Sequence, residues 1–247
     1  MQIATDVLND EDIRIRASAI IGLGKSGQQD AIKPLTAILE NKSEIDWLRA
    51  CAAIALGRIS GDEVLPPLIN ALREESIEVA RAAILALGDV KNEKAIPALK
   101  DLFEDQAKIE LHALMIKIIG RIGGDSVVPL LLRALESTNN QVRCNAVLTL
   151  GDLRTKEAVL PLIKILKDKD ECLRAVAASS LGLIGDTQVV QPLIEALSDK
   201  TEMVRTVAAS SLGFLGSREA ISPLAKALGD ESEKVRKQAS AALSKLR

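Results

Sequence analysis

The sequence predicts an all-α fold, an α-solenoid wound as a right-handed superhelix from about eight short helical hairpins. Three observations predict it. A glycine, usually preceded by leucine, recurs every 31 to 33 residues; a proline follows this glycine at a nearly fixed distance; and an arginine precedes it by eight residues in most copies. The composition, 47% hydrophobic and 27% charged, is typical of a chain that can bury a long core.

The repeated positions define the units. The glycine position is occupied by Gly24, Gly57, Gly88, Gly120, Gly151, Gly182, Gly213 and, in the last copy, Ser244. The prolines are Pro34, Pro67, Pro97, Pro129, Pro161, Pro192 and Pro223, and the arginine position holds Arg16, Arg49, Arg143, Arg174, Arg205 and Arg236. The spacing predicts a single solenoid domain over residues 1–247, with units of about 31 residues at approximately 3–23, 24–56, 57–87, 88–119, 120–150, 151–181, 182–212 and 213–247.

The first helix of each unit is expected to begin just before its proline. In the segment from Val189 to Leu197, apolar residues recur at helical spacing. Pro192 can lie in the first turn of that helix, because a backbone N–H there has no intrahelical partner to lose.

The second helix of each unit is expected to end at a glycine. The segment from Val204 to about Leu215 is rich in alanine and is followed by Gly216, which can adopt the left-handed conformation that closes helices. Gly27, Gly123 and Gly185 occupy the same place in other units. Neither helix could bury its apolar face alone, so neighbouring hairpins must stack.

The repeated pattern resembles a known family. The segments from Val142 to Gly151 and from Ala158 to Leu166 are similar to the short HEAT-like repeat of the phycocyanobilin lyase type, and the resemblance spans about residues 3 to 247. It implies an α-solenoid of HEAT-like hairpins. The family includes chromophore lyase subunits, which are expected to act as paired chains, and also signalling adaptors, so the resemblance implies no single function.

Charge and composition argue against several classes of protein. With 32 basic and 34 acidic residues the net charge is −2, which gives little electrostatic drive toward nucleic acid. Trp47, Phe103 and Phe214 are the whole aromatic complement, so platforms for stacking bases are missing. No stretch reaches the roughly 20 apolar residues of a membrane span, and no signal peptide precedes the repeats. We therefore expect a cytoplasmic protein that binds neither nucleic acid nor membrane.

No residue pattern points to catalysis, a metal or a cofactor. Cys51, Cys144 and Cys172 are odd in number and far apart, so they indicate neither a disulfide framework nor a zinc site. The single histidine, His112, stands at the arginine position of its unit, where Ala80 stands one unit earlier. A tolerated structural substitution is one interpretation of His112, and contact with a ligand or partner is the alternative.

The arginines recur together with acidic residues. Asp10, Asp168, Asp199 and Asp230 each precede an arginine position by six residues. One interpretation is an acid–base ladder that ties each inter-helix loop to the following helix and holds neighbouring units in register. The alternative is a row of arginines that binds anions.

The candidate binding site is the concave surface, which in HEAT-like solenoids is lined by the second helices. A helical wheel predicts that positions one, five and nine residues after the arginine position point away from the core. The candidate residues on this surface are Ile21, Lys25, Ile54, Arg58, Arg81, Leu85, Lys117, Arg121, Leu148, Leu183 and Phe214. They would form an apolar groove with basic margins, suited to an acidic amphipathic segment of a partner protein or to a small apolar carboxylated ligand. The alternative is that small residues at the first of these positions let the helices pack closely and partly cover the apolar side chains.

The predicted function is that of a non-catalytic protein-binding scaffold or adaptor. The alternative is a tetrapyrrole (bilin) binding protein or a bilin lyase-like subunit that acts with a partner chain. A lyase needs a group for proton transfer or thiol addition, and Cys144 and Cys51 are the groups near the inner face.

The N-terminal edge carries a further expectation. The first helix, at Ile3 to Asp10, lacks the proline and preceding turn of the other units. Two interpretations follow: a piece of a longer array, or self-association through the N-terminal edge.

Overall fold

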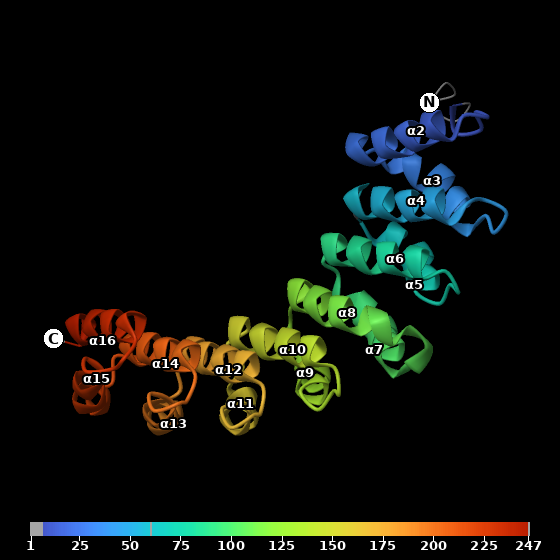
Figure 1. The fold of residues 1–247 in the computed structure, drawn as a ribbon. Helices are drawn as coiled ribbons and strands as arrows, with labels where there is room; N and C mark the ends of the chain where they lie inside the picture. The colour runs from blue at the N-terminus through green and yellow to red at the C-terminus, as the bar shows by residue number, and fades with distance from the viewer. Residues whose placement is uncertain (1–6, 60, 247) are drawn as a thin grey trace. The chain divides into compact units, whose positions relative to one another are not determined.

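The computed structural model describes residues 7–59 and 61–246, and all regular structure within these ranges is helical. The predicted all-α solenoid of helical hairpins is confirmed (Figure 1). The chain divides into two compact units, Met1–Val127 and Val128–Arg247. None of the helices in the described ranges combines the length and apolar character that crossing a bilayer requires.

In the first unit, four second helices form one row and three first helices form another (Figure 1). The second helices are α2 (Ile13–Ser26), α4 (Asp46–Ile59), α6 (Ile77–Val90) and α8 (Ile109–Ile122). The first helices are α3 (Ile32–Glu40), α5 (Leu65–Ala71) and α7 (Ile96–Glu104). Short 3-10 turns link the helices: η1 (Gln29–Ala31), η2 (Asp62–Val64), η3 (Glu93–Ala95), η4 (Gln106–Lys108) and η5 (Asp125–Val127).

The second unit repeats this arrangement. Its first helices are α9 (Val128–Ala134), α11 (Val159–Ile165), α13 (Val190–Ala196) and α15 (Ile221–Ala227). Its second helices are α10 (Asn140–Asp152), α12 (Glu171–Ile184), α14 (Glu202–Leu215) and α16 (Glu233–Lys245). The turns η6 (Lys156–Ala158), η7 (Thr187–Val189) and η8 (Arg218–Ala220) lead into the first helices.

The helix ends follow the local sequence signals with one exception. Pro192 lies in the first turn of α13, and α14 ends at Gly216 with a left-handed φ of 72°. Gly27 and Gly185 close their helices in the same conformation. Gly123 differs: its φ is 79° but its ψ is −161°, so the predicted left-handed closure is wrong there, and the chain leaves α8 extended.

The repeated glycine lets neighbouring second helices touch. A Cβ built on Gly57 would lie 2.7 Å from the Cα of Ala86, closer than real Cβ atoms approach. A Cβ would also lie under 3.0 Å from a side chain or backbone of the next second helix at Gly24, Gly88, Gly151, Gly182 and Gly213. At these six positions the repeated glycine is therefore a packing requirement, since a side chain would force the two helices apart.

The arginines form a ladder, but its carboxylate partners are not the predicted ones. Arg174 donates from Nε and Nη2 to the two carboxylate oxygens of Asp199, at 2.8 and 2.9 Å, and from Nη1 to the Asp168 carbonyl at 2.9 Å. Arg205 donates in the same way, from Nε and Nη2 to the carboxylate of Asp230 and from Nη1 to the Asp199 carbonyl. The aspartate six residues earlier thus offers its carbonyl, and the carboxylate comes from the following hairpin. The predicted link between neighbouring hairpins is confirmed, but its carboxylate partner is corrected.

The ladder shifts the ionisation of its aspartates. Burial of Asp199 alone would raise its pKa, but hydrogen bonds from Arg174 and from the Thr201 N–H outweigh it, and the pKa lies below its ordinary value. The Arg205 guanidinium, against a smaller effect of burial, lowers the pKa of Asp230 in the same direction. Both carboxylates are therefore held ionised at neutral pH.

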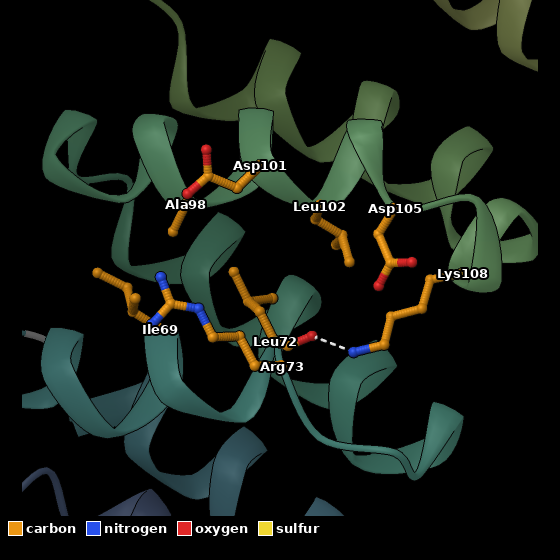
Figure 2. Close-up of a pocket in the computed structure, with 8 residues that line it drawn as sticks. All are labelled: Ile69, Leu72, Arg73, Ala98, Asp101, Leu102, Asp105 and Lys108. Carbon is orange, nitrogen blue, oxygen red and sulfur yellow. Dashed lines mark hydrogen bonds between the residues drawn. The ribbon is translucent and has the colours of Figure 1, made fainter.

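In the two hairpins that lack the arginine, other side chains contact the backbone carbonyls of the inter-helix loop. In the hairpin with Ala80, the buried Lys108 reaches back from the next hairpin and donates from Nζ to the Leu72 carbonyl at 2.7 Å (Figure 2). In the following hairpin His112 is buried, with Nε2 3.2 Å from the Asp105 carbonyl and its ring centroid 4.8 Å from that of Phe103. These contacts favour the structural interpretation of His112.

Candidate functional site

In each of the two compact units, the candidate residues lie on the solvent-facing side of the second helices, which we call the second-helix face. None of the eleven is buried. Ile54, Leu85 and Leu183 are half-buried, and the exposed ones are Ile21, Lys25, Arg58, Arg81, Lys117, Arg121, Leu148 and Phe214. The positions five and nine residues after the arginine position thus point away from the core, as the wheel predicts.

For the position one residue after the arginine position, the wheel is wrong in three hairpins. Ala17, Ala50 and Ala175 stand there and are only 5%, 6% and 4% exposed. The repeated glycines bring neighbouring second helices so close that a small side chain at this position is covered. Ala113, Cys144 and Thr206 are half-buried at this position, and the long side chains Arg81 and Lys237 are exposed. The same close packing leaves Ile54 and Leu85 half-buried, as the alternative interpretation proposes.

The first unit places eight candidate residues on α2, α4, α6 and α8, and its second-helix face is basic. Within the described residues, Lys25, Arg58, Arg81 and Lys117 have no acidic partner in an ion pair. Arg121 differs, because its Nη2 lies 2.7 Å from Oδ1 of Asp89 on α6. The basic margin predicted for the groove therefore rests on four unpaired cations, and Arg121 contributes less to it than the sequence suggests.

Sequence reasoning missed Trp47, which is 45% exposed at the start of α4. Trp47, Cys51, Ile54 and Arg58 are spaced by four, three and four residues, so they form one stripe along the helix. Extending the wheel one turn toward the N-terminus would have found it. Met203, 40% exposed, is the equivalent residue on α14.

The second unit carries an apolar and nearly uncharged version of this face. Leu148 on α10 is 45% exposed and Phe214 on α14 is 59% exposed, with Leu183 half-buried on α12. The exposed charges at equivalent positions are few: Asp152 on α10, Lys237 and Lys245 on α16, and Lys234 on α16, which pairs with Glu202. The two units therefore offer surfaces of different chemistry, one basic and one neutral.

Cys51 and Cys144 are free thiols that are poorly suited to nucleophilic attack. Burial, with a smaller contribution from Glu78, raises the pKa of the Cys51 thiol, and burial together with Asp170 raises that of Cys144. A reactive cysteine requires the opposite shift. In the part of the chain that the structure describes, no three His, Cys, Asp or Glu side chains are grouped as metal ligands.

Hollows separate neighbouring first helices. A cavity of about 200 Å³ lies between α5 and α7, and one of about 340 Å³ lies between α11 and α13. Figure 2 shows the first, where Arg73, Asp101, Asp105 and Lys108 bring charges of both signs to its wall. Neighbouring second helices are in contact, whereas cavities separate neighbouring first helices. Within each compact unit, the second helices are therefore packed more closely than the first helices.

Family models match most of the chain. Residues 43–114, 106–171 and 159–244 match HEAT repeats, and residues 15–41 match the PBS lyase HEAT-like repeat. A sequence relative is the phycocyanobilin lyase subunit alpha of Nostoc sp. (strain PCC 7120), 28% identical over 176 residues. The match covers 64% of this chain and 63% of that protein, so the chain spans less than two thirds of the relative's length.

Solved structures share the fold. The complex of CpcE and CpcF of phycocyanin lyase from Nostoc sp. PCC7120 matches with 24% identity and a TM-score of 0.53, covering 100% of this chain and 94% of that one. YibA of E. coli matches with 23% identity and a TM-score of 0.65, covering 99% and 91%. Kap95p, solved with RanGDP, matches with 15% identity and a TM-score of 0.67, covering 99% of this chain and 40% of that one.

Proposed function

The chain belongs to the HEAT repeat family, and we propose that it is a non-catalytic scaffold that binds a partner protein on its second-helix face. The observation that supports this most is the exposure of Trp47 on α4 and Ile21 on α2, on the same face as the unpaired cations. Exposed apolar side chains grouped on one face usually mark an interaction site. The solved complexes of related fold support a protein partner in general terms.

The chemistry of the first unit favours an acidic amphipathic segment as the partner. Lys25, Arg58, Arg81 and Lys117 would attract its carboxylates, and Trp47 would anchor its apolar side. Tryptophan is enriched among the residues that dominate binding energy, and unpaired cations at the margin of an interface mainly raise the association rate. A small apolar ligand that carries carboxylates is the alternative occupant of this face.

The proposal is tested by binding kinetics with a partner recovered from the native source. Lys117→Glu should slow association about threefold to tenfold and weaken its salt dependence, because charge steers encounter. Trp47→Ala and Leu85→Ser should mainly speed dissociation, Trp47→Ala by tenfold or more, as expected for an aromatic anchor.

Matched controls lie on the first helices. Lys33 is an exposed cation on α3, and Leu160 on α11 is 64% exposed. Lys33→Glu and Leu160→Ser should leave both rate constants unchanged. If these controls weaken binding and the second-helix variants do not, the binding surface lies on the first helices and the proposal is wrong.

A bilin lyase-like subunit is the second candidate, supported by the 28% identity to a phycocyanobilin lyase subunit. The raised thiol pKa values of Cys51 and Cys144 weigh against thiol addition by these two residues. Titration of free bilins into the chain, followed by absorbance, separates the two candidates. The scaffold proposal predicts an unchanged spectrum, whereas a red shift that saturates at one equivalent would favour tetrapyrrole handling.

A further inference from the structure

Lys108 is a buried cation that lacks a carboxylate partner. It is 7% exposed, and its Nζ donates to the Leu72 carbonyl. The buried arginines of the ladder each pair with a carboxylate: Arg49 with Glu74, Arg174 with Asp199 and Arg205 with Asp230. Among the described residues, no acidic side chain pairs with Lys108. A buried charge without a counter-charge is unfavourable, and an ammonium has three donors, so an anionic group from outside the chain would be stabilised at Nζ.

The cavity between α5 and α7 gives such a group access to Lys108. Its volume is about 200 Å³, and Lys108 is part of its wall (Figure 2). Pockets for drug-sized ligands are larger, roughly 300–1,000 Å³, so this cavity suits a smaller molecule. Its apolar lining consists of Ile69, Leu72, Ala98 and Leu102. An occupant should therefore carry a small apolar group beside its polar ones.

Charges of opposite sign lie on the two sides of this cavity (Figure 2). Arg73 follows α5, and Nζ of Lys108 lies on the same side because it bonds to the Leu72 carbonyl. Asp101 on α7 and Asp105 just after it supply the negative charges. The part of the chain that the structure describes shows no ion pair for any of these four side chains. Their charges sum to zero, so a zwitterion matches the cavity better than an anion or a cation does.

The cavity between α11 and α13 provides a comparison. The charged residues of its wall are Lys167, Glu195 and Asp199. Nζ of Lys167 lies 4.0 Å from Oε2 of Glu195, and Asp199 pairs with Arg174. These charges are satisfied within the chain, whereas those of the α5–α7 cavity are not. The unpaired charges therefore do not follow from the repeated architecture alone.

We propose that the cavity between α5 and α7 binds a small zwitterion, an α-amino acid with an apolar side chain. Its carboxylate would accept hydrogen bonds from Lys108 and Arg73. Its ammonium would donate to Asp101 or Asp105, and its side chain would pack against the apolar lining. Hydrogen bonds between charged groups are stronger than neutral ones. The cavity lies between first helices, so this proposal does not depend on the scaffold function of the second-helix face.

Isothermal titration calorimetry of the whole chain with L-leucine, L-valine and L-alanine tests the proposal. At least one of them should bind saturably at one site per chain. Two analogues of leucine separate the charges: 4-methylpentanoate lacks the ammonium, and 3-methylbutylamine lacks the carboxylate. Each should bind at least about tenfold more weakly than leucine, because each leaves charged groups of the cavity without a partner. The proposal is overturned if none of the three amino acids binds, or if 4-methylpentanoate binds as tightly as leucine.

Variants locate the site. Lys108→Met and Asp101→Asn should each weaken amino-acid binding about tenfold or more, since each removes a charged partner. Because Lys108→Met also loses the bond to the Leu72 carbonyl, Ala98→Phe provides a second test that keeps every charge. Ala98 is half-buried at the cavity wall, so a phenyl ring there should fill the cavity and abolish binding. The thermal unfolding temperature of Ala98→Phe should stay near that of the wild type.

Two control variants leave the cavity intact. Glu195→Gln changes the wall of the α11–α13 cavity, and Lys117→Glu changes the second-helix face. Both should bind the amino acid as the wild type does, and an unchanged Lys117→Glu separates this site from the scaffold surface. Binding that survives both Lys108→Met and Ala98→Phe must use another site, and this result overturns the proposal. Loss of binding in Glu195→Gln alone does so as well.

Discussion

Gly57→Ala is expected to lower the free energy of unfolding of the first unit by about 2 kcal/mol. The added Cβ would lie 2.7 Å from both the Cα and the Cβ of Ala86, so a backbone must move to admit it. Overpacking a well-packed core typically costs about 1–3 kcal/mol, and the gain in helix propensity from glycine to alanine offsets up to about 1 kcal/mol of it. We expect the loss to stay large because two helix backbones, rather than a flexible side chain, meet at this point.

Gly22→Ala is the matched control. Gly22 also lies within a helix, but a Cβ there meets nothing within 4 Å. The substitution therefore changes only the helix propensity, and the free energy of unfolding of this variant should rise by about 0.5–1 kcal/mol. Urea unfolding followed by far-UV circular dichroism measures both variants at a concentration where the chain is monomeric. Equal effects of the same sign would mean that the glycine position does not set the distance between second helices.

Arg174→Met is expected to lower the free energy of unfolding by about 3 kcal/mol. The guanidinium is buried and holds the carboxylate of Asp199 and the carbonyl of Asp168 on two hairpins. Removing one partner of a buried pair leaves the other charge without compensation, which typically costs about 3–5 kcal/mol. Lys237→Met removes an exposed pair with Glu233 and should cost at most about 0.5 kcal/mol.

The same rung predicts how stability depends on pH. The pKa of Asp199 is lower in the folded chain than its ordinary value of about 3.9, so its contribution is fully present above that pH. It is lost as the pH falls through the folded-state pKa. Free energies of unfolding measured between about pH 6 and pH 3 should therefore fall less steeply for Arg174→Met than for the wild type. Parallel curves would contradict a role for this rung in acid unfolding.

The sequence predicts best the features that depend on neighbouring residues. Pro192 and Gly216 mark helix ends through their own backbone preferences, so a short segment suffices to place them. The ladder was harder to predict, because the sequence offers Arg174 and Arg205 an aspartate both six residues earlier and 25 residues later. Periodicity cannot distinguish these two, since only the stacked structure decides which carboxylate lies within reach.

The candidate surface was predicted in outline and missed in detail. Exposure at Ile21, Leu148 and Phe214 follows from the helical wheel alone. Burial of Ala17 and Ala50 does not, because it depends on the distance between helices that the glycines allow. The substitution of Lys108 for the missing arginine was also beyond the pattern, since it comes from the next hairpin and breaks the periodicity.

Site-specific photo-crosslinking to the bound partner tests the central claim most directly. A photoreactive side chain at Arg58 or Ser210 would report from the second-helix face, and one at Leu160 or Asp101 would report from the first helices. All four residues are exposed, so each probe can be introduced without disturbing the core. The scaffold account predicts crosslinks from Arg58, from Ser210 or from both, and none from the first helices. Crosslinks from Leu160 or Asp101 alone would contradict it.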